Sequence, residues 1–158
     1  MLYINMLSRL VTTCIFIVFC GCSSVGSPSS HALENHLPSS AVTILAAPDE
    51  IHYYRMSPKS FIGEDLLGGY RVIADEGVVT SSALVEYLSE SDNLSFSYIK
   101  KVRLYPEFGF AFVNGDERVL VLISITTRQV EFVYDDVRIM ANCDTSIEPL
   151  KTILATIT

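Results

Sequence analysis

The chain has 158 residues, 49% of them hydrophobic, and its 11 basic and 18 acidic side chains give a formal net charge of −7. An acidic protein repels phosphate backbones, so this balance argues against non-specific binding to nucleic acid. The basic residues are scattered, and their one cluster, Lys100, Lys101 and Arg103, is expected to lie on a solvated strand face.

The N-terminus has the plan of a signal peptide. Arg9 provides a short basic region, and Leu10 to Phe19 is apolar apart from two threonines. A spanning helix needs about 20 predominantly apolar residues, and this run stops at Gly21, before a serine-rich stretch. We therefore predict a signal peptide over residues 1–21, with Met1 or Met6 as its start, and no permanent spanning helix.

The end of this segment, Phe19-Cys20-Gly21-Cys22, resembles the lipobox of bacterial lipoproteins. The resemblance implies cleavage before Cys22, a lipid thioether on its sulfur, and loss of the upstream cysteines with the signal peptide. Phe19 departs from the family, which more often has leucine at this position. The alternative is an ordinary secretory signal cleaved nearby, with Cys22 as an incidental thiol.

The same resemblance implies a location. Several acyl chains, palmitate among them, hold a protein stably at a membrane, whereas one chain gives only marginal binding. Ser23, rather than aspartate, after the cysteine resembles outer-membrane sorting in Gram-negative lipoproteins. We therefore expect an exported protein anchored by lipid to the bacterial outer membrane, with its domain in the periplasm or at the cell surface.

Residues 22–40 are predicted to be the lipidated cysteine and a flexible tether. Seven of the 18 residues from Ser23 to Ser40 are serine, with glycine and proline as breakers. Such a composition buries too little apolar surface to order itself. His31 and His36 lie here, and because a disordered stretch has no preorganised metal geometry, we interpret them as part of the spacer.

Residues 41–158 are predicted to form a single globular domain, since 118 residues is an ordinary domain size. The patterns in its first third predict, in order, an apolar run Ala41–Ala47, a strand Ile51–Met56, a loop Phe61–Gly69 with Leu66 and Leu67 packed inward, a short strand Tyr70–Ala74 and a turn Asp75-Glu76-Gly77. A helix over Thr80–Glu90 follows, capped by Ser81 or Ser82, with Leu84, Val85, Tyr87 and Leu88 at helical spacing. Asn93-Leu94-Ser95 is expected to be a loop.

Two hairpins are predicted between Phe108 and Tyr134. Asn114-Gly115 favours a two-residue type I′ turn, which pairs Phe110 with Val119, and a turn near Thr127-Arg128 pairs Ile123 with Phe132. The two registers place one apolar set on a common face: Phe108, Phe110, Phe112, Val119, Val121, Ile123, Ile125, Val130, Phe132 and Tyr134. The central strand is apolar on both sides, so we expect material to pack against each face.

A final helix is predicted from about Ser146, with Ile147, Leu150, Leu154 and Ile157 at three-four-three spacing. Pro149 falls in its first turn, where the missing N–H has no intrahelical partner to lose. The predicted fold class is therefore α+β, an antiparallel meander packed against one or two helices.

Three stretches of this domain resemble a group of uncharacterised exported and lipoprotein domains of bacteria: Gly69–Ile73, Tyr105–Phe110 and Val121–Val130. Relatives often carry cysteines before the proline of the second stretch and in a C-x-x-C at the end of the strand. Here those positions are Arg103, Ser124 and Thr127. The resemblance therefore implies the fold without any metal or redox role, and it implies no activity.

The folded part offers few groups for catalysis, and we assign no catalytic, cofactor-binding or metal-ligating residue. His52 is its one histidine, and a half-exposed strand position explains it much better than catalysis does. The acidic pairs Asp49-Glu50, Asp75-Glu76 and Asp135-Asp136 are expected at solvated turns. Cys143 is expected to be a packed thiol whose pKa nearby carboxylates raise.

Two functions remain open from the sequence. The preferred one is a non-enzymatic envelope lipoprotein that acts as a binding or structural module, with the membrane and an envelope protein as its partners and no cofactor. The alternative is a small envelope hydrolase that uses His52 together with a carboxylate. A pocket containing His52 and a carboxylate within hydrogen-bond reach favours the enzyme.

Overall fold

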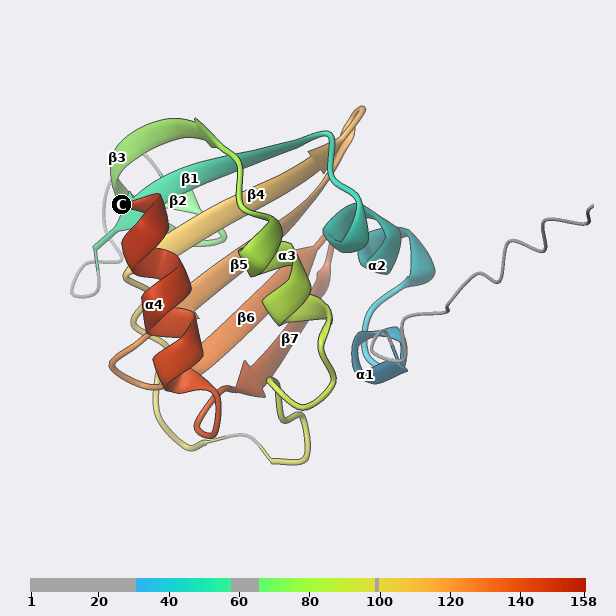
Figure 1. Ribbon diagram of the computed structural model, residues 1–158, viewed down its shortest axis with the longest axis vertical. Coiled ribbons are helices and arrows are strands. Elements are labelled where there is room, and N and C mark those ends of the chain that lie inside the picture. Colours follow the sequence, from blue (N-terminus) through green and yellow to red (C-terminus); the bar gives the residue numbers. More distant parts are fainter. Residues whose placement is uncertain (1–30, 58–65, 99) are drawn as a thin grey trace, which may run out of the picture.

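The computed structural model describes residues 31–57, 66–98 and 100–158. In these ranges the helices are α1 (His31–Glu34), α2 (Ser39–Ala46), α3 (Ser82–Ser89) and α4 (Ile147–Ile157). The strands are β1 (Glu50–Met56), β2 (Leu66–Leu67), β3 (Tyr70–Val79), β4 (Phe108–Asn114), β5 (Glu117–Ser124), β6 (Gln129–Tyr134) and β7 (Val137–Asn142). All described strands form one antiparallel sheet in the order β2-β3-β1-β4-β5-β6-β7, with the helices on one of its faces (Figure 1). The α+β class is confirmed.

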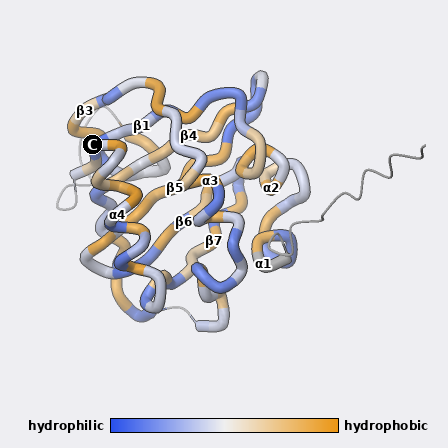
Figure 2. The backbone as a smooth tube through the Cα atoms, viewed as in Figure 1, coloured by the Kyte–Doolittle hydropathy of each residue, from blue (hydrophilic) through white to orange (hydrophobic). Residues whose placement is uncertain are grey.

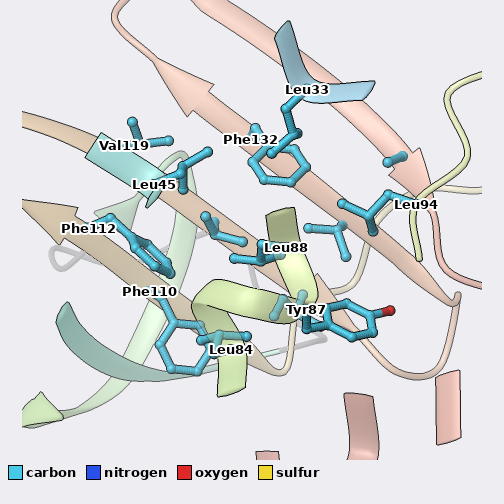
Figure 3. Close-up of a cluster of buried hydrophobic side chains, with 14 of the residues drawn as sticks. Leu33, Leu45, Leu84, Tyr87, Leu88, Leu94, Phe110, Phe112, Val119 and Phe132 are labelled. Carbon is cyan, nitrogen blue, oxygen red and sulfur yellow. The ribbon is translucent and has the colours of Figure 1, made fainter. Parts of the chain in front are cut away.

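The main core lies between this sheet and the helices. Phe110, Phe112 and Phe132 are fully buried on the helix-facing side of β4 and β6. Leu84, Tyr87 and Leu88 of α3 reach down onto them, as Figure 3 shows. The hydrophobic stretches of the central strands run beneath the helices, while their connecting turns are hydrophilic (Figure 2). These rings are among the largest fully buried side chains, and their burial contributes strongly to the stability of the core.

Both hairpins form, but each register differs from the predicted one by two residues. Phe110 pairs with Val121 rather than Val119, and Ile123 pairs with Val130 rather than Phe132. A shift of two residues leaves every side chain on its original face, because side chains alternate with a period of two. The predicted apolar face is therefore confirmed in full, with Phe108 and Ile125 partly buried and the other eight residues buried.

Two carboxylates bind the backbone of the turns at the observed registers. The first turn is Gly115-Asp116, of which only Gly115 has positive φ (57°), so the predicted type I′ turn at Asn114-Gly115 is wrong. The Gly115 N–H donates to the Asp49 carboxylate at 3.1 Å. In the second turn, the N–H groups of Ile125 and Thr126 donate to the Glu107 carboxylate at 2.9 and 3.2 Å.

The predicted tether is wrong over its described part. Residues 31–40 contain α1 and the start of α2, and Leu33 and Leu37 are buried in the main core. Leu33 lies in α1 and Leu37 in the link to α2, and both are buried in the same core as Ala41 and Ile44. The folded domain therefore includes residues 31–40 as well. Residues 22–30 lie outside the described residues.

Helices α3 and α4 match their predictions closely. Ser81 caps α3, since its Oγ accepts the Leu84 N–H at 3.2 Å. Ser146 precedes α4, and Leu150 and Leu154 are buried beneath the helix. The predicted loop at Asn93–Ser95 contains only an isolated bridge from Ser95 to Asn142.

Two strands differ from the expectation. The predicted turn Asp75-Glu76-Gly77 lies inside β3, which runs on to Val79 rather than ending at Ala74. β7 was not predicted, because its polar and half-buried residues lack a clear alternation. In the predicted loop before β3, Leu67 is buried as expected, whereas Leu66 is half exposed. Phe61 and Ile62 lie outside the described residues.

The second face of the sheet is covered only in part. A smaller apolar cluster lies there, made of Met56, Leu67, Leu104, Ala111, Leu120 and Leu122. Arg138 of β7 holds Glu131 through two hydrogen bonds of 3.1 and 2.9 Å and also donates to the Gly68 carbonyl at 3.1 Å. Because Gly68 lies in the β2–β3 turn, this contact links the two ends of the sheet and curls it around the smaller cluster.

We expect Phe110→Ala to destabilise the domain by about 3–5 kcal/mol, because the ring is fully buried and its loss leaves a cavity. Chemical denaturation of the full chain measures this difference. Val102→Ala, at an exposed apolar residue, serves as the control and should change stability by less than about 0.5 kcal/mol. Equal effects of the two substitutions would contradict the assignment of Phe110 to the core.

Candidate functional site

Beyond Arg71, β3 forms one edge of the described sheet. β2 pairs only with Tyr70 and Arg71, whereas β1 pairs along the inner side of β3 from Val72 to Val79. Among the described residues no strand pairs with the outer side of Val72–Val79. Ile73 and Val78 are 57% and 59% exposed on this strand. An edge of this kind presents unpaired backbone N–H and C=O groups together with apolar side chains.

Irregular pairing shapes this edge. The register between β1 and β3 shifts twice, and each shift leaves one residue of β3, Glu76 or Ile73, without a partner across the strands. Gly77 has a φ of 86°, which glycine adopts without strain, and its N–H donates to Asp75 Oδ1 at 2.9 Å. Such bulges bend a strand and increase its twist. A turn was predicted at Asp75-Glu76-Gly77 because glycine and acidic residues are common in turns, and the same residue types also occur in bulges.

Two cavities lie on opposite sides of this edge. The first has a volume of about 690 Å³ and includes Ile73, Glu76 and Val79 of β3, with Phe108 and the C-terminal residue Thr158 opposite them. The second, of about 470 Å³, lies on the other face between Val72, Ile73, Leu66 and Tyr54. Side chains of an extended segment placed along β3 would point alternately into the two cavities.

The larger cavity contains both polar and apolar groups. Arg55 lies 3.3 Å from the Glu76 carboxylate in a solvent-exposed ion pair. The Tyr53 ring stacks on Phe110 at 5.2 Å between centroids. Burial and the nearby Glu76 carboxylate raise the pKa of Tyr53, so its hydroxyl remains a neutral hydrogen-bond donor at physiological pH.

A third cavity, of about 480 Å³, lies at the Val79 end of the edge. Its apolar wall includes Val78, Val79 and Val85. Asp49, Glu50 and Glu86 also line it, and no lysine or arginine does. This end of the edge therefore combines an apolar surface with a negative potential.

His52 lies on the partly covered face of β1, close to a carboxylate. Its Nε2 is 3.0 Å from Glu50 Oε2, and the His52 side chain is 30% exposed. Its neighbours across the sheet are Val78 and Ala111, so the adjoining strands bring no nucleophile to it. His52 lines none of the four cavities described for the domain. The carboxylate required for the hydrolase is present, whereas the pocket is not seen around His52.

Cys143 is fully buried beside Tyr87 and Ser146, below the start of α4. The hydroxyls of Tyr87 and Ser146 lie 2.7 Å apart, and Ser146 donates to the Asn93 carbonyl at 2.5 Å. Burial raises the pKa of the Cys143 thiol to about 11, with Asp144 adding to the shift and Lys100 opposing it. The thiol is therefore protonated at neutral pH and is a poor nucleophile.

The other residues singled out in the sequence have structural roles. Lys100 was expected on a solvated strand face, but it lies in a loop and contacts Asp144 at 2.6 Å. His36 stacks on Phe96 at 4.3 Å between centroids. Within the described ranges no group of three His, Cys, Asp or Glu side chains is arranged to hold a metal ion. Cys22 lies outside the described residues.

Comparison of the chain with protein-family models, with curated proteins and with solved structures gives no significant match. None of the described helices is both long and apolar enough to cross a membrane. The function is therefore inferred from the residues of this protein alone.

We expect the Cys143 thiol to react slowly in the native state. A full chain carrying Cys14→Ser, Cys20→Ser and Cys22→Ser has Cys143 as its single thiol, and it should react with Ellman's reagent only after denaturation. Thiolate absorbance should show a midpoint near pH 11 in the folded protein, against the ordinary thiol value of 9.0. Rapid labelling at neutral pH, or a reducible dimer on gels, would instead make Cys143 a reactive cysteine.

The raised pKa also makes folding pH-dependent. The unfolded thiol ionises near pH 9 while the folded one holds its proton to about pH 11. Because the folded state binds the proton more tightly, the contribution of Cys143 to stability is complete below pH 9 and is lost between these values. Cys143→Ala in the same chain removes this contribution and serves as the control in denaturation measured across that range.

Proposed function

We propose that this protein is an envelope lipoprotein whose domain is a non-enzymatic binding module. Among the described residues no strand pairs with the outer side of Val72–Val79, and this edge, with exposed Ile73 and Val78 and a cavity on each face, is the observation that carries the binding function. Apolar side chains beside unpaired backbone are typical of interaction surfaces. The partner in this proposal is another protein of the envelope.

The anchor in this proposal is Cys22. The support is the lipobox-like Phe19-Cys20-Gly21-Cys22 at the end of an apolar run. Lipid on Cys22 would hold the domain at the membrane, and Ser23 favours the outer membrane. Eight residues, 23–30, separate Cys22 from α1, so the domain would work close to the membrane surface.

A hydrolase built on His52 is the second candidate. The 3.0 Å contact between His52 Nε2 and Glu50 Oε2 favours it, because a carboxylate orients and activates an imidazole base. The apolar neighbours Val78 and Ala111 weigh against it, since covalent catalysis needs a nucleophile within hydrogen-bond reach of the base. The binding module is therefore preferred.

We predict that Cys22 carries the lipid anchor. Metabolic labelling with a palmitate analogue should mark the wild-type protein, and Cys22→Ala should lose both the label and the membrane fraction. Cys20→Ala is the matched control, because it changes the neighbouring cysteine that leaves with the signal peptide. Labelling that persists in Cys22→Ala would refute the proposed anchor.

We predict that a photo-crosslinking amino acid placed at Ile73 captures a discrete partner in the native envelope. The same group at Thr152, on the exposed side of α4, is the control and should give no such adduct. His52→Ala should leave the adduct unchanged, whereas a hydrolase would lose activity in this variant. Absence of an adduct at Ile73, or equal yields at the two positions, contradicts the proposed binding surface.

A further inference from the structure

The part of β3 that has no outer neighbour among the described residues is long enough to pair with another strand. Val72–Val79 comprises eight residues, which span about 26 Å at the usual rise of a strand. Peptide recognition by strand addition uses such an edge: backbone hydrogen bonds supply affinity, and pockets for alternate side chains supply specificity. The cavities of about 690 and 470 Å³ provide those pockets on the two faces.

The charges along this edge are predominantly negative. Asp75 and Glu76 lie in β3 itself, and Glu86 lies at the rim of the third cavity. Arg55, the basic side chain of the larger cavity, is already paired with Glu76 at 3.3 Å. Figure 2 shows hydrophilic residues between two hydrophobic stretches along β3. The edge therefore favours a segment that combines basic and apolar residues.

A second copy of the chain fits this edge poorly. Antiparallel pairing of two β3 strands about a two-fold axis at Asp75 would place the two Asp75 side chains together and each Glu76 beside Ala74 of the other copy. Like charges directly opposite in a sheet are destabilising. The formal net charge of −7 per chain adds a general repulsion between copies.

We propose that the edge Val72–Val79 binds an extended, basic segment of a partner protein as an added strand, with alternate side chains in the two flanking cavities. This inference rests on the proposed function and names its partner class. The edge is selective for such a segment. Its bulges at Ile73 and Glu76 disfavour a flat strand, and its acidic residues disfavour an acidic one.

The test uses the full chain in detergent micelles and a fluorescent eight-residue peptide that alternates lysine and valine. A peptide with glutamate in place of lysine should bind at least about tenfold more weakly. In an added strand, only every second backbone N–H of the peptide faces β3. Methylating these nitrogens should weaken binding by about tenfold or more, whereas methylating the other alternate set should have little effect. Hydrogen exchange should slow at alternate amides between Val72 and Val79.

Charge variants separate a specific site from general attraction. Glu86→Lys should weaken binding of the lysine peptide and strengthen binding of the glutamate peptide. Asp136→Lys, at an exposed residue of the β6–β7 turn that lines none of the three cavities along β3, should alter the binding of both peptides far less. An equal loss of peptide affinity in the two protein variants would overturn the strand-addition proposal. An equal loss of affinity for the two methylation patterns would also overturn it.

The two levels of the proposal fail in different ways. A crosslinked partner at Ile73 together with peptides insensitive to backbone methylation would leave the binding function in place and refute strand addition. No adduct at Ile73 would contradict the binding function itself. Alternating sensitivity to methylation together with an adduct at Ile73 supports both.

Discussion

The packing of three phenylalanine rings against the helices is the contact on which this fold depends. Phe110, Phe112 and Phe132 come from neighbouring parts of the sheet and meet leucines of α2 and α3. Each ring buries a large apolar area, and their positions on one face fix which side of β4, β5 and β6 points to the helices. One face of the sheet therefore packs against the helices, and the other has a smaller apolar cluster.

The second face is stabilised differently from the face that the helices cover. With the helices on one side, the described residues that cover the apolar side chains of the other face include Leu67 and Leu104, and the curl of the sheet adds to this cover. The ion pair of Arg138 with the buried Glu131, and the bond from Arg138 to the Gly68 carbonyl, hold this curl across strands distant in sequence. Loss of either charged partner would leave the other partly buried without compensation.

The curl also bears on the proposed function. Among the described residues, β2 comprises Leu66 and Leu67, which pair with Tyr70 and Arg71, and no strand pairs with the outer side of β3 beyond them. The bulged pairing that allows this bend places Ile73 and Glu76 beside the larger cavity. In the proposed binding module, one feature therefore curls the sheet and shapes the surface that takes the partner.

The sequence by itself determined the local elements and the face of each strand. Ser81, Pro149 and the spacing of apolar residues were enough to predict α3 and α4, because caps and helical periodicity are local. The alternation from Phe108 to Tyr134 was enough to predict the buried face. The tertiary structure decided the hairpin registers, through Asp49 and Glu107, which act from outside the hairpins. It also decided that Leu33 and Leu37 join the core, and that Asp75–Gly77 is a bulge within an open edge. These features depend on contacts between residues far apart in the chain, and such contacts leave no local pattern in the sequence.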